Sequence, residues 1–156
     1  MAFVEKTVEL DVPVGTAYNQ WTQFEEFPRF MEGVLEVNQL DDTRLHWVAE
    51  IGGRRKEWYS KIEDQVPDYL LTWYSEDGVE TMGEVAFEPL GENRTRIRLR
   101  MEYEPEDIVE GIGDKLGFVS RRVDGDLKRF KEFIEERGVP TGAWRGSIQG
   151  GHRLNG

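Results

Sequence analysis

The sequence predicts an α+β domain in which an antiparallel sheet packs against one long C-terminal helix. Two observations carry this prediction. From residue 35 to residue 103, apolar and polar residues alternate in short segments separated by turn sequences, which is typical of neighbouring antiparallel strands. Apolar residues then recur every three or four positions from Ile108 to Ile134, which is typical of an amphipathic helix.

The N-terminal segment alternates polar with apolar residues up to Pro13, which predicts a first strand. After it, the apolar side chains of residues 21–31, WTQFEEFPRFM, follow helical spacing on two separate stripes. Pro28 lies among them, where its missing N–H and its ring would break a continuous helix. We therefore expect two short helices after strand one, with Pro28 in the first turn of the second and Gly33 ending the pair.

Six further strands are expected after Gly33, because apolar alternation resumes there between strong turn sequences. The turns contain Asp-Asp, Gly-Gly, Pro-Asp and Asp-Gly pairs, and they are short enough to join antiparallel neighbours but not parallel strands. With the first strand they make a seven-stranded antiparallel sheet. The six predicted strands cover residues 35–39, 44–51, 54–65, 69–75, 80–89 and 94–103.

The long helix is expected to begin at Pro105, which is followed by two acids, and to end at Gly138, two residues before Pro140. Glycines interrupt the predicted helix, and each costs about 1 kcal/mol relative to alanine. Their missing side chains leave room for a ligand, let the first turns bend as a gate, or permit a close approach of helix and sheet. The four glycines are Gly111, Gly113, Gly117 and Gly125.

These elements make one domain, residues 1–138, and leave a Gly-rich tail, residues 139–156. The tail has no acidic residue and no continuous apolar pattern, so we expect it to be flexible. Trp144 is unusual there, because a lone indole has no local core to join. The alternative is that the tail docks on a partner or on the mouth of the protein's own cavity.

The charge balance argues against several classes of function. The 156 residues include 20 basic and 31 acidic side chains, and the net charge of −11 disfavours binding to nucleic acid or to an anionic membrane. Cysteine is absent, so disulfides and thiolate sites are excluded. Neither a signal peptide nor an apolar run of about 18 residues is found, so we expect a cytoplasmic protein without integral membrane contact.

No catalytic, metal-binding or cofactor-binding set of residues is predicted. The glycines of GIGDKLG, residues 111–117, miss the dinucleotide spacing, and no parallel strand-helix-strand unit surrounds them. Only two histidines occur, His46 on an expected outer face and His152 in the tail. Two histidines in these places are too few for a histidine-based triad or metal site. The acidic pairs lie at helix starts or turns, and the basic run at 54–56 is interpreted as a charged hairpin edge.

Alternation along each strand separates the side chains that face the long helix from those that face solvent. The helix-facing set is almost wholly apolar or aromatic, which suits either a solid core or a cavity for an apolar ligand. The arginines of residues 94–100 fall on the solvent face. The helix-facing residues are Leu45, Trp47, Ala49, Ile51, Trp58, Ser60, Ile62, Leu71, Trp73, Val85, Phe87, Ile97, Leu99, Met101 and Tyr103.

Three stretches carry a family resemblance: VPVGTAYNQWTQFEEFPRFMEGV after the first strand, HWVAEIGGRRKEWYSKI across a hairpin, and GDLKRFKEFIEERG in the long helix. From residue 3 to about residue 138 the chain resembles the START-like (SRPBCC) superfamily, in particular its polyketide cyclase/dehydrase and coenzyme-Q-binding-protein branch. The resemblance implies the helix-grip fold, a strongly curved antiparallel sheet wrapping the long helix. It also implies a cavity for a hydrophobic small molecule, a class that ranges over lipids, sterols, polyketides, quinones and plant hormones.

With this resemblance, we expect a carrier or sensor of a lipid, an isoprenoid quinone or a polyketide-like aromatic. One alternative is a cyclase or dehydratase in which Tyr103, Ser60 or an indole N–H orients a carbonyl group, ranked lower because no acid or base is expected to face the cavity. Another is a protein-interaction or stress-related module, and a homodimer is left open. The residues expected to contact ligand are Phe27, Phe30, Met31, Trp47, Trp58, Ser60, Leu71, Trp73, Phe87, Leu99, Met101, Tyr103, Leu116 and Val119, with Phe30 the first choice.

Overall fold

A computed structural model describes residues 2–108 and 114–154 of the chain. Its strands are β1 (Ala2–Leu10), β2 (Val34–Gln39), β3 (Arg44–Ile51), β4 (Arg54–Val66), β5 (Leu70–Ser75), β6 (Thr81–Gly91), β7 (Arg94–Tyr103), β8 (Ile148–Gln149) and β9 (His152–Arg153). Its helices are α1 (Val14–Trp21), the 3₁₀-helix η1 (Phe24–Arg29), α2 (Pro105–Ile108) and α3 (Lys115–Arg137).

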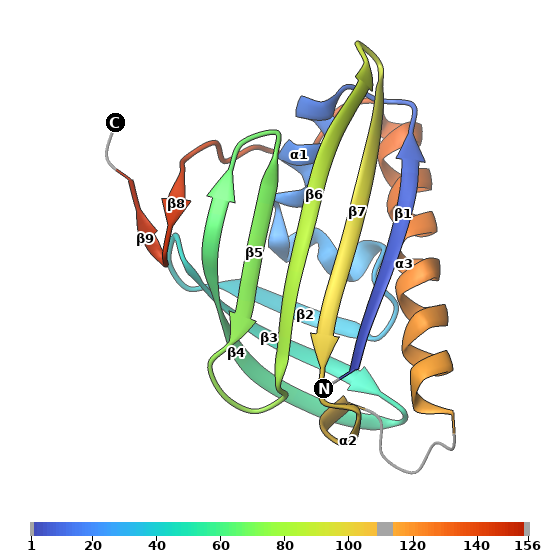
Figure 1. Cartoon of the computed structure of the whole chain (residues 1–156), viewed down its shortest axis with the longest axis vertical. Coiled ribbons are helices and arrows are strands. Elements are labelled where there is room, and N and C mark those ends of the chain that lie inside the picture. Colours follow the sequence, from blue (N-terminus) through green and yellow to red (C-terminus); the bar gives the residue numbers. More distant parts are fainter. Residues whose placement is uncertain (1, 109–113, 155–156) are drawn as a thin grey trace.

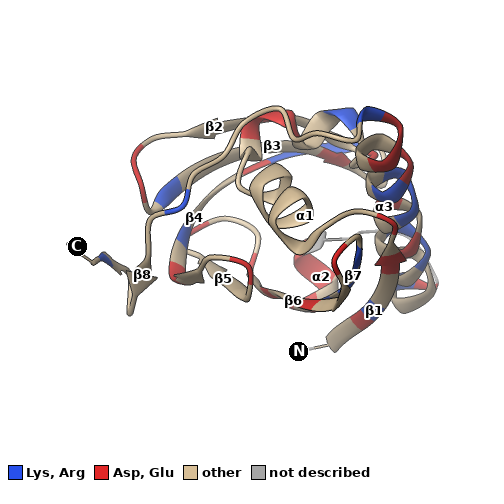
Figure 2. Ribbon diagram, turned by 90° about the horizontal axis from the view of Figure 1, so that it is seen from above, with Lys and Arg blue, Asp and Glu red and all other residues tan. Residues whose placement is uncertain are grey.

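The first seven strands form one antiparallel sheet in the order β1-β7-β6-β5-β4-β3-β2, and β8 and β9 attach to it through the end of β4. The sheet curves around α1 and leaves one open side (Figure 2). On that side α3 runs along β1 and is bonded to the loop that leads into β2 (Figure 1). This arrangement confirms the α+β, helix-grip prediction.

The strands follow the sequence pattern closely. β3 and β7 have the predicted bounds, and the other four meander strands differ from the prediction by one or two residues at an end. The largest difference is in β6, which continues past Pro89 to Gly91 through a register shift. Proline cannot donate to the ladder, so a bulge lets the strand pass it.

The two helices after β1 are confirmed, but the predicted place of Pro28 is wrong. Pro28 lies near the end of η1 rather than in its first turn. A short 3₁₀-helix has few i→i+3 bonds to lose, so it accepts a residue without an N–H. The turn is closed beyond Pro28 by the N–H groups of Phe30 and Met31, which both donate to the carbonyl of Phe27 (3.1 and 2.8 Å).

The predicted single helix from residue 105 to residue 138 is wrong at its start. Pro105 begins the separate α2, and α3 begins after Asp114, whose side chain accepts a hydrogen bond from the Gly117 N–H (3.0 Å). Aspartate favours such a helix cap over a helix interior because its carboxylate satisfies a free backbone donor. The predicted end is confirmed, since Gly138 has φ 72° and its N–H donates to the Ile134 carbonyl.

Most of the predicted apolar stripe of α3 is buried against the sheet. Leu116 is the exception, because its side chain is 56% exposed. In the first turn of α3, Phe118 faces the interior instead. Leu116 is the second residue of α3, so it lies in the first turn, where helical spacing alone does not decide which side chains are covered. The buried stripe residues are Val119, Val123, Leu127, Phe130 and Ile134.

The described part of the tail, residues 139–154, is packed on the domain at several points, so the prediction of a flexible tail is wrong. Thr141 exchanges two hydrogen bonds with the side chain of Gln20 (2.8 and 3.0 Å). The backbone N–H of Trp144 donates to the Thr22 hydroxyl (3.1 Å), and the Trp144 side chain is partly buried against the core. These bonds hold the segment beside α1.

Further along, the tail joins the sheet. Ile148 is 1% exposed and pairs with Gln65 at the end of β4. Arg145 forms an ion pair with Asp68 (2.6 Å) and lies over the ring of Tyr18. The tail therefore docks on its own domain, at the edge of the sheet near β4 (Figure 1), and not at the cavity mouth.

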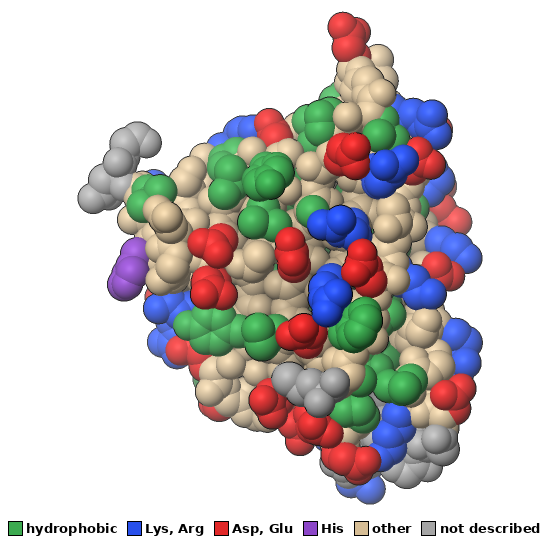
Figure 3. Space-filling model, viewed as in Figure 1, with side chains coloured by type: hydrophobic (Ala, Val, Ile, Leu, Met, Phe, Trp, Pro, Cys, Tyr) green, Lys and Arg blue, Asp and Glu red, His purple; other side chains and the backbone are tan. Residues whose placement is uncertain are grey.

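The outer face of the sheet carries charges of both signs (Figure 3). As predicted, the arginines of β7 point to solvent, where Arg98 and Arg100 lie 3.7 and 3.5 Å from the carboxylate of Glu5 on β1. Glu5 is directly opposite Arg100 and diagonal to Arg98, and opposite charges placed in this way support the sheet modestly. Within the described residues, no helix combines the length and the apolar character needed to cross a membrane.

Candidate functional site

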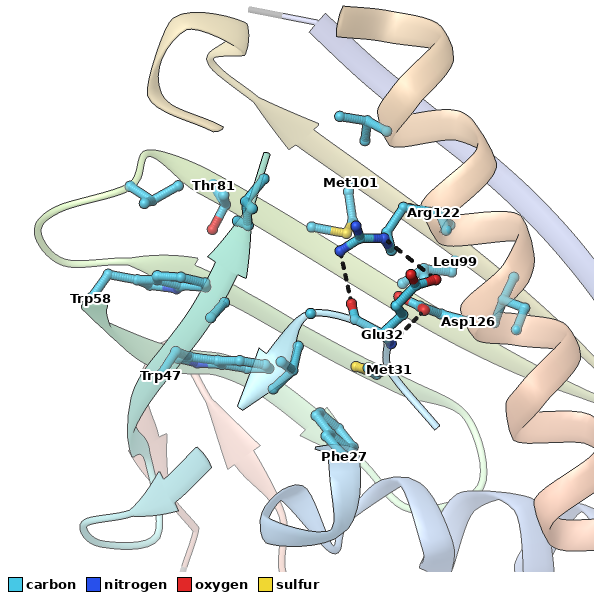
Figure 4. A pocket seen from close by; sticks show the side chains of 18 of the residues that line it. Phe27, Met31, Glu32, Trp47, Trp58, Thr81, Leu99, Met101, Arg122 and Asp126 are labelled. Atoms are coloured by element: carbon cyan, nitrogen blue, oxygen red, sulfur yellow. Dashed lines mark hydrogen bonds and ion pairs between the residues drawn. The ribbon is translucent and has the colours of Figure 1, made fainter. Parts of the chain in front are cut away.

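A cavity of about 160 Å³ lies between the concave face of the sheet, the η1–β2 loop and α3. Strands β3, β4, β5 and β7 supply aromatic and aliphatic side chains to one wall, and α3 supplies the other. The charged groups gather at a single corner, where α3 meets the loop before β2, and the Thr81 hydroxyl lies apart from them (Figure 4). The molecule thus has both a solid core and a separate apolar space.

Two stacked tryptophans line one end of the cavity. Trp47 on β3 is directly opposite Trp58 on β4, and their rings are stacked at 5.8 Å between centroids with an interplanar angle of 3°. The indole N–H of Trp47 donates to the hydroxyl of Ser60 (2.8 Å), which fixes the plane of its ring. Both side chains point into the cavity (Figure 4). Their parallel planes favour a flat, aromatic occupant.

A third tryptophan, Trp73 on β5, lines the cavity above a glycine. Trp73 is paired with Gly83 on β6, and a side chain at Gly83 would overlap the six-membered part of the Trp73 indole. The absence of a Cβ at Gly83 therefore lets this indole lie close to the sheet. A bulkier residue there would push the ring and reduce the depth of the cavity.

The polar corner joins α3 to the loop before β2. The Glu32 N–H donates to Asp126 (3.0 Å), while Arg122 Nη1 donates to the Glu32 carbonyl (2.8 Å). Arg129 forms a short ion pair with Asp126 and also donates from Nε to the carbonyl of Phe30 (3.0 Å). Glu32, Arg122 and Asp126 border the cavity. These contacts fix the loop against the helix and place charged groups beside an apolar space.

Asp126 has the most perturbed ionisation at the site. Burial raises the pKa of Asp126 from its ordinary 3.8 to about 6, although the hydrogen bonds from Arg129 and from the Glu32 N–H favour the ionised form. A carboxyl group with this pKa exchanges its proton close to neutral pH. The corner therefore holds a proton donor or acceptor that alternation along the strands did not reveal.

Eight of the fourteen residues predicted to contact ligand line the cavity. They come from η1 and its following loop, from four strands and from α3. Strand alternation and helical spacing therefore selected the correct faces at these positions, and contact with a ligand stays a prediction. The eight are Phe27, Met31, Trp47, Trp58, Trp73, Leu99, Met101 and Val119.

The other six lie outside the lining of this cavity. Phe30, the first choice, is 2% exposed and packs with Trp21, Phe130 and Phe133 in the core. Alternation shows which face a side chain takes but not which part of that face is hollow. The six are Phe30, Ser60, Leu71, Phe87, Tyr103 and Leu116.

Two of these six show where the interior is filled. Phe87 packs edge-on against Tyr18 of α1, with 5.3 Å between ring centroids, so α1 occupies that part of the concave face. Tyr103 is 1% exposed, and burial raises the pKa of its phenol above the ordinary value. Neither side chain borders the cavity, which removes Tyr103 as a group that could orient a ligand there.

The main omission of the sequence analysis is the charged corner. Arg122 and Asp126 are four residues apart, so they lie on one side of α3 next to the buried Val123 and Leu127. Charged pairs at this spacing ordinarily mark a solvated helix face, and nothing in the sequence distinguishes this pair. Thr81 and Phe118 also border the cavity and were not predicted.

The helix glycines do not enlarge the cavity at the two positions that the structure describes. A Cβ at Gly117 would meet the side chain of Asp114, and one at Gly125 would approach the guanidinium of Arg129. Gly111 and Gly113, together with the proposed gate, lie outside the described residues. Among residues 2–108 and 114–154, no group of three or more His, Asp or Glu side chains is arranged to hold a metal ion.

Comparisons with known proteins agree with the fold. Residues 10–132 match the family model described as polyketide cyclase/dehydrase and lipid transport. An uncharacterized 17.2 kDa protein of Streptomyces lincolnensis is 49% identical over 149 residues, which cover 95% of this chain and 99% of that protein.

Two solved structures have the same fold at low identity. The Zhui aromatase/cyclase from a Streptomyces species superposes with a TM-score of 0.74 at 17% identity, covering 92% of this chain and 99% of the other. A START superfamily protein from Mycobacterium smegmatis gives a TM-score of 0.67 at 17% identity, covering 86% and 95%. At these identities the likeness concerns the fold alone.

Proposed function

The chain belongs to the polyketide cyclase/dehydrase and lipid transport family of START-like proteins, and from this premise we propose that it binds a small hydrophobic molecule as a carrier or sensor. The observation that carries the proposal is the cavity between sheet and helix, whose wall is apolar and aromatic except at one charged corner and at Thr81. Ligand pockets commonly combine such a wall with a few placed polar groups.

The wall favours an aromatic ligand. Trp47, Trp58 and Trp73 offer flat faces, and Phe27 and Phe118 complete a wall of rings. A cavity of about 150 Å³ is enough to bind benzene, so the space of about 160 Å³ takes at least one aromatic ring without rearrangement. A lipid, an isoprenoid quinone or a polyketide-like aromatic would extend through the opening or widen it.

A cyclase or dehydratase is the second candidate, and Asp126 is the observation that favours it. Its carboxyl group borders the cavity and has a pKa of about 6, as a general acid or base near neutral pH requires. The two roles differ in outcome. A carrier releases its ligand unchanged, whereas an enzyme releases a cyclised or dehydrated product.

The test begins with native mass spectrometry of protein purified from its own host, followed by extraction of the bound material. We expect a co-purifying apolar or aromatic molecule. Incubation of the extracted compound with fresh protein then separates carrier from enzyme, since only an enzyme changes its mass. A protein that is empty and takes up no apolar compound would contradict both candidates.

Two wall substitutions locate the binding site. Trp47→Ala and Trp58→Ala should each weaken ligand binding about tenfold or more, because a large aromatic contact is lost. Arg98→Ala is the matched control, since Arg98 lies on the outer face of β7 and is 54% exposed. Dissociation constants from fluorescence or calorimetric titration measure the effect. Equal losses in all three variants would place the ligand elsewhere.

A further inference from the structure

The polar corner contains the guanidinium of Arg122 on α3, and only one of its nitrogens, Nη1, donates a hydrogen bond within the described residues. Within the described residues, Arg122 is the one basic side chain in the cavity wall. It is 23% exposed and reaches over the cavity between Met101 and Glu32 (Figure 4). A cation at the edge of an apolar space is suited to fix the orientation of a ligand.

Three features hold this guanidinium in place. Nη1 donates to the carbonyl of Glu32 (2.8 Å), and the group lies over the ring of Phe118, with 5.1 Å from Cζ to the centroid. Gly33, at φ 87°, allows the close approach, because a side chain there would overlap Nη1. A donor that is already fixed loses little conformational entropy when it binds a ligand.

The rest of the guanidinium is available to a ligand. Among the described residues no hydrogen-bond partner is found for Nη2, and Nε is 4.0 Å from the Glu32 carboxylate. That carboxylate is 66% exposed and also lies 3.6 Å from Arg129, so it is loosely held and well hydrated. Asp126 competes little for this guanidinium, because Arg129 and the Glu32 N–H already engage its carboxylate and Arg122 acts on it only through its charge.

We propose that Arg122 anchors the anionic end of an amphipathic ligand whose aromatic body fills the cavity. This inference rests on the proposed function and narrows it to aromatic carboxylates and related oxygen acids. The planar guanidinium matches the geometry of a carboxylate. Because Arg122 lines the cavity and is still partly exposed, the acid group keeps part of its hydration while the ring is buried, which avoids the cost of burying a charge.

The test uses naphthoate and naphthamide, two probes with the same aromatic body and different charge. Isothermal titration calorimetry at neutral pH and about 0.15 M salt limits the influence of distant charges, which are screened beyond about 8 Å. We expect the unmodified chain to bind naphthoate more tightly than naphthamide. Arg122→Gln should weaken naphthoate about tenfold to a hundredfold and leave naphthamide unchanged, because only the anion loses a charge-assisted hydrogen bond.

Three further variants sharpen the result. Arg121→Gln is the matched control, since Arg121 is 70% exposed, pairs with Asp114 and lies outside the cavity wall, and it should affect neither probe. Arg122→Lys should keep part of the preference for naphthoate. Glu32→Gln should tighten naphthoate binding, because it removes the competing carboxylate. Thermal unfolding of each variant checks that the fold is intact.

The outcomes separate this inference from the function on which it rests. If Arg122→Gln weakens both probes equally, or neither, Arg122 is only structural and the anchor is wrong, while the apolar cavity still binds. If the unmodified chain binds neither probe, the anchor is wrong, and the proposed function fails as well if the chain takes up no other apolar compound. If Arg122→Gln does not fold, the Arg122→Lys and Glu32→Gln variants decide, and unchanged naphthoate binding in both overturns the anchor.

Discussion

Asp126 shows how burial of one residue affects the stability of the whole chain. Its pKa rises from 3.8 to about 6, chiefly because burial penalises the ionised carboxylate. The folded chain therefore holds this proton more tightly than the unfolded chain does. The stability that the group contributes is complete below about pH 4 and is lost as the pH rises through about 6.

We expect Asp126→Asn to abolish this pH dependence. Between about pH 4 and 7, the free energy of unfolding of the unmodified chain should fall by about 3 kcal/mol relative to that of the variant. Urea unfolding of both proteins across this range measures the change. Asp126→Asn also loses the ion pair with Arg129, which lowers the stability of the variant. The prediction concerns how the free energy of unfolding changes with pH and not its absolute value.

Asp124→Asn on the same helix is the matched control. A hydrogen bond from Lys128 lowers the pKa of Asp124, so its contribution is present at neutral pH and is lost on acidification, the opposite sign. The prediction is contradicted if the free energy of unfolding depends on pH in the same way in the unmodified chain and in Asp126→Asn. It is also contradicted if the two differ with the sign expected for Asp124. Either result would mean that the ion pair with Arg129 outweighs the effect of burial on Asp126.

At the scale of elements, the segment after α3 behaves as part of the sheet. Ile148 is 1% exposed, and the hydrogen bonds of Thr141 and Trp144 tie the segment to α1. Within the described residues, no part of this segment borders the cavity. Its contribution should therefore concern stability and leave ligand binding intact.

We expect deletion of the chain after Gly138 to lower the melting temperature, and Ile148→Ala alone to cost about 2–4 kcal/mol of unfolding free energy. Leu154→Ala is the control, because its side chain is 48% exposed and its loss should cost less than about 0.5 kcal/mol. Chemical unfolding and ligand titration of the same variants measure both properties. Equal stability of Ile148→Ala and Leu154→Ala, together with an unchanged melting temperature after the deletion, would show that the docked segment contributes nothing.

For the whole molecule, local patterns were enough to predict the order of the elements and the faces of the strands. Alternation placed Trp47 and Trp58 toward the helix because a strand has a fixed period and its turns are short. The hollow part of the interior could not be predicted in this way. Phe30 and Phe87 have the correct face, but other side chains fill the space beside them.

Long-range contacts explain the remaining differences. The tail has no local apolar pattern, and its docking depends on Gln20 and Gln65, which are distant in sequence. The charged corner likewise brings Glu32 beside Arg122 and Asp126, about ninety residues further along the chain. Neither set of long-range contacts produces a periodic pattern within one segment. The fold was therefore predictable from the sequence, whereas the polar part of the site was not.

The charge of the whole molecule leads to a last prediction. With 31 acidic and 20 basic residues, repulsion among the excess acids opposes folding, while exposed ion pairs such as Arg98–Glu5 contribute only about 0–1 kcal/mol each. We therefore expect the melting temperature at neutral pH to rise as salt increases from about 0.01 M to 0.15 M, because the screening length shrinks from about 30 Å to 8 Å. Calorimetric scans measure this, with scans near the isoelectric pH of about 4.7 as the control, where the salt effect should vanish. A melting temperature that falls with salt at neutral pH would mean that the ion pairs of the sheet outweigh the repulsion.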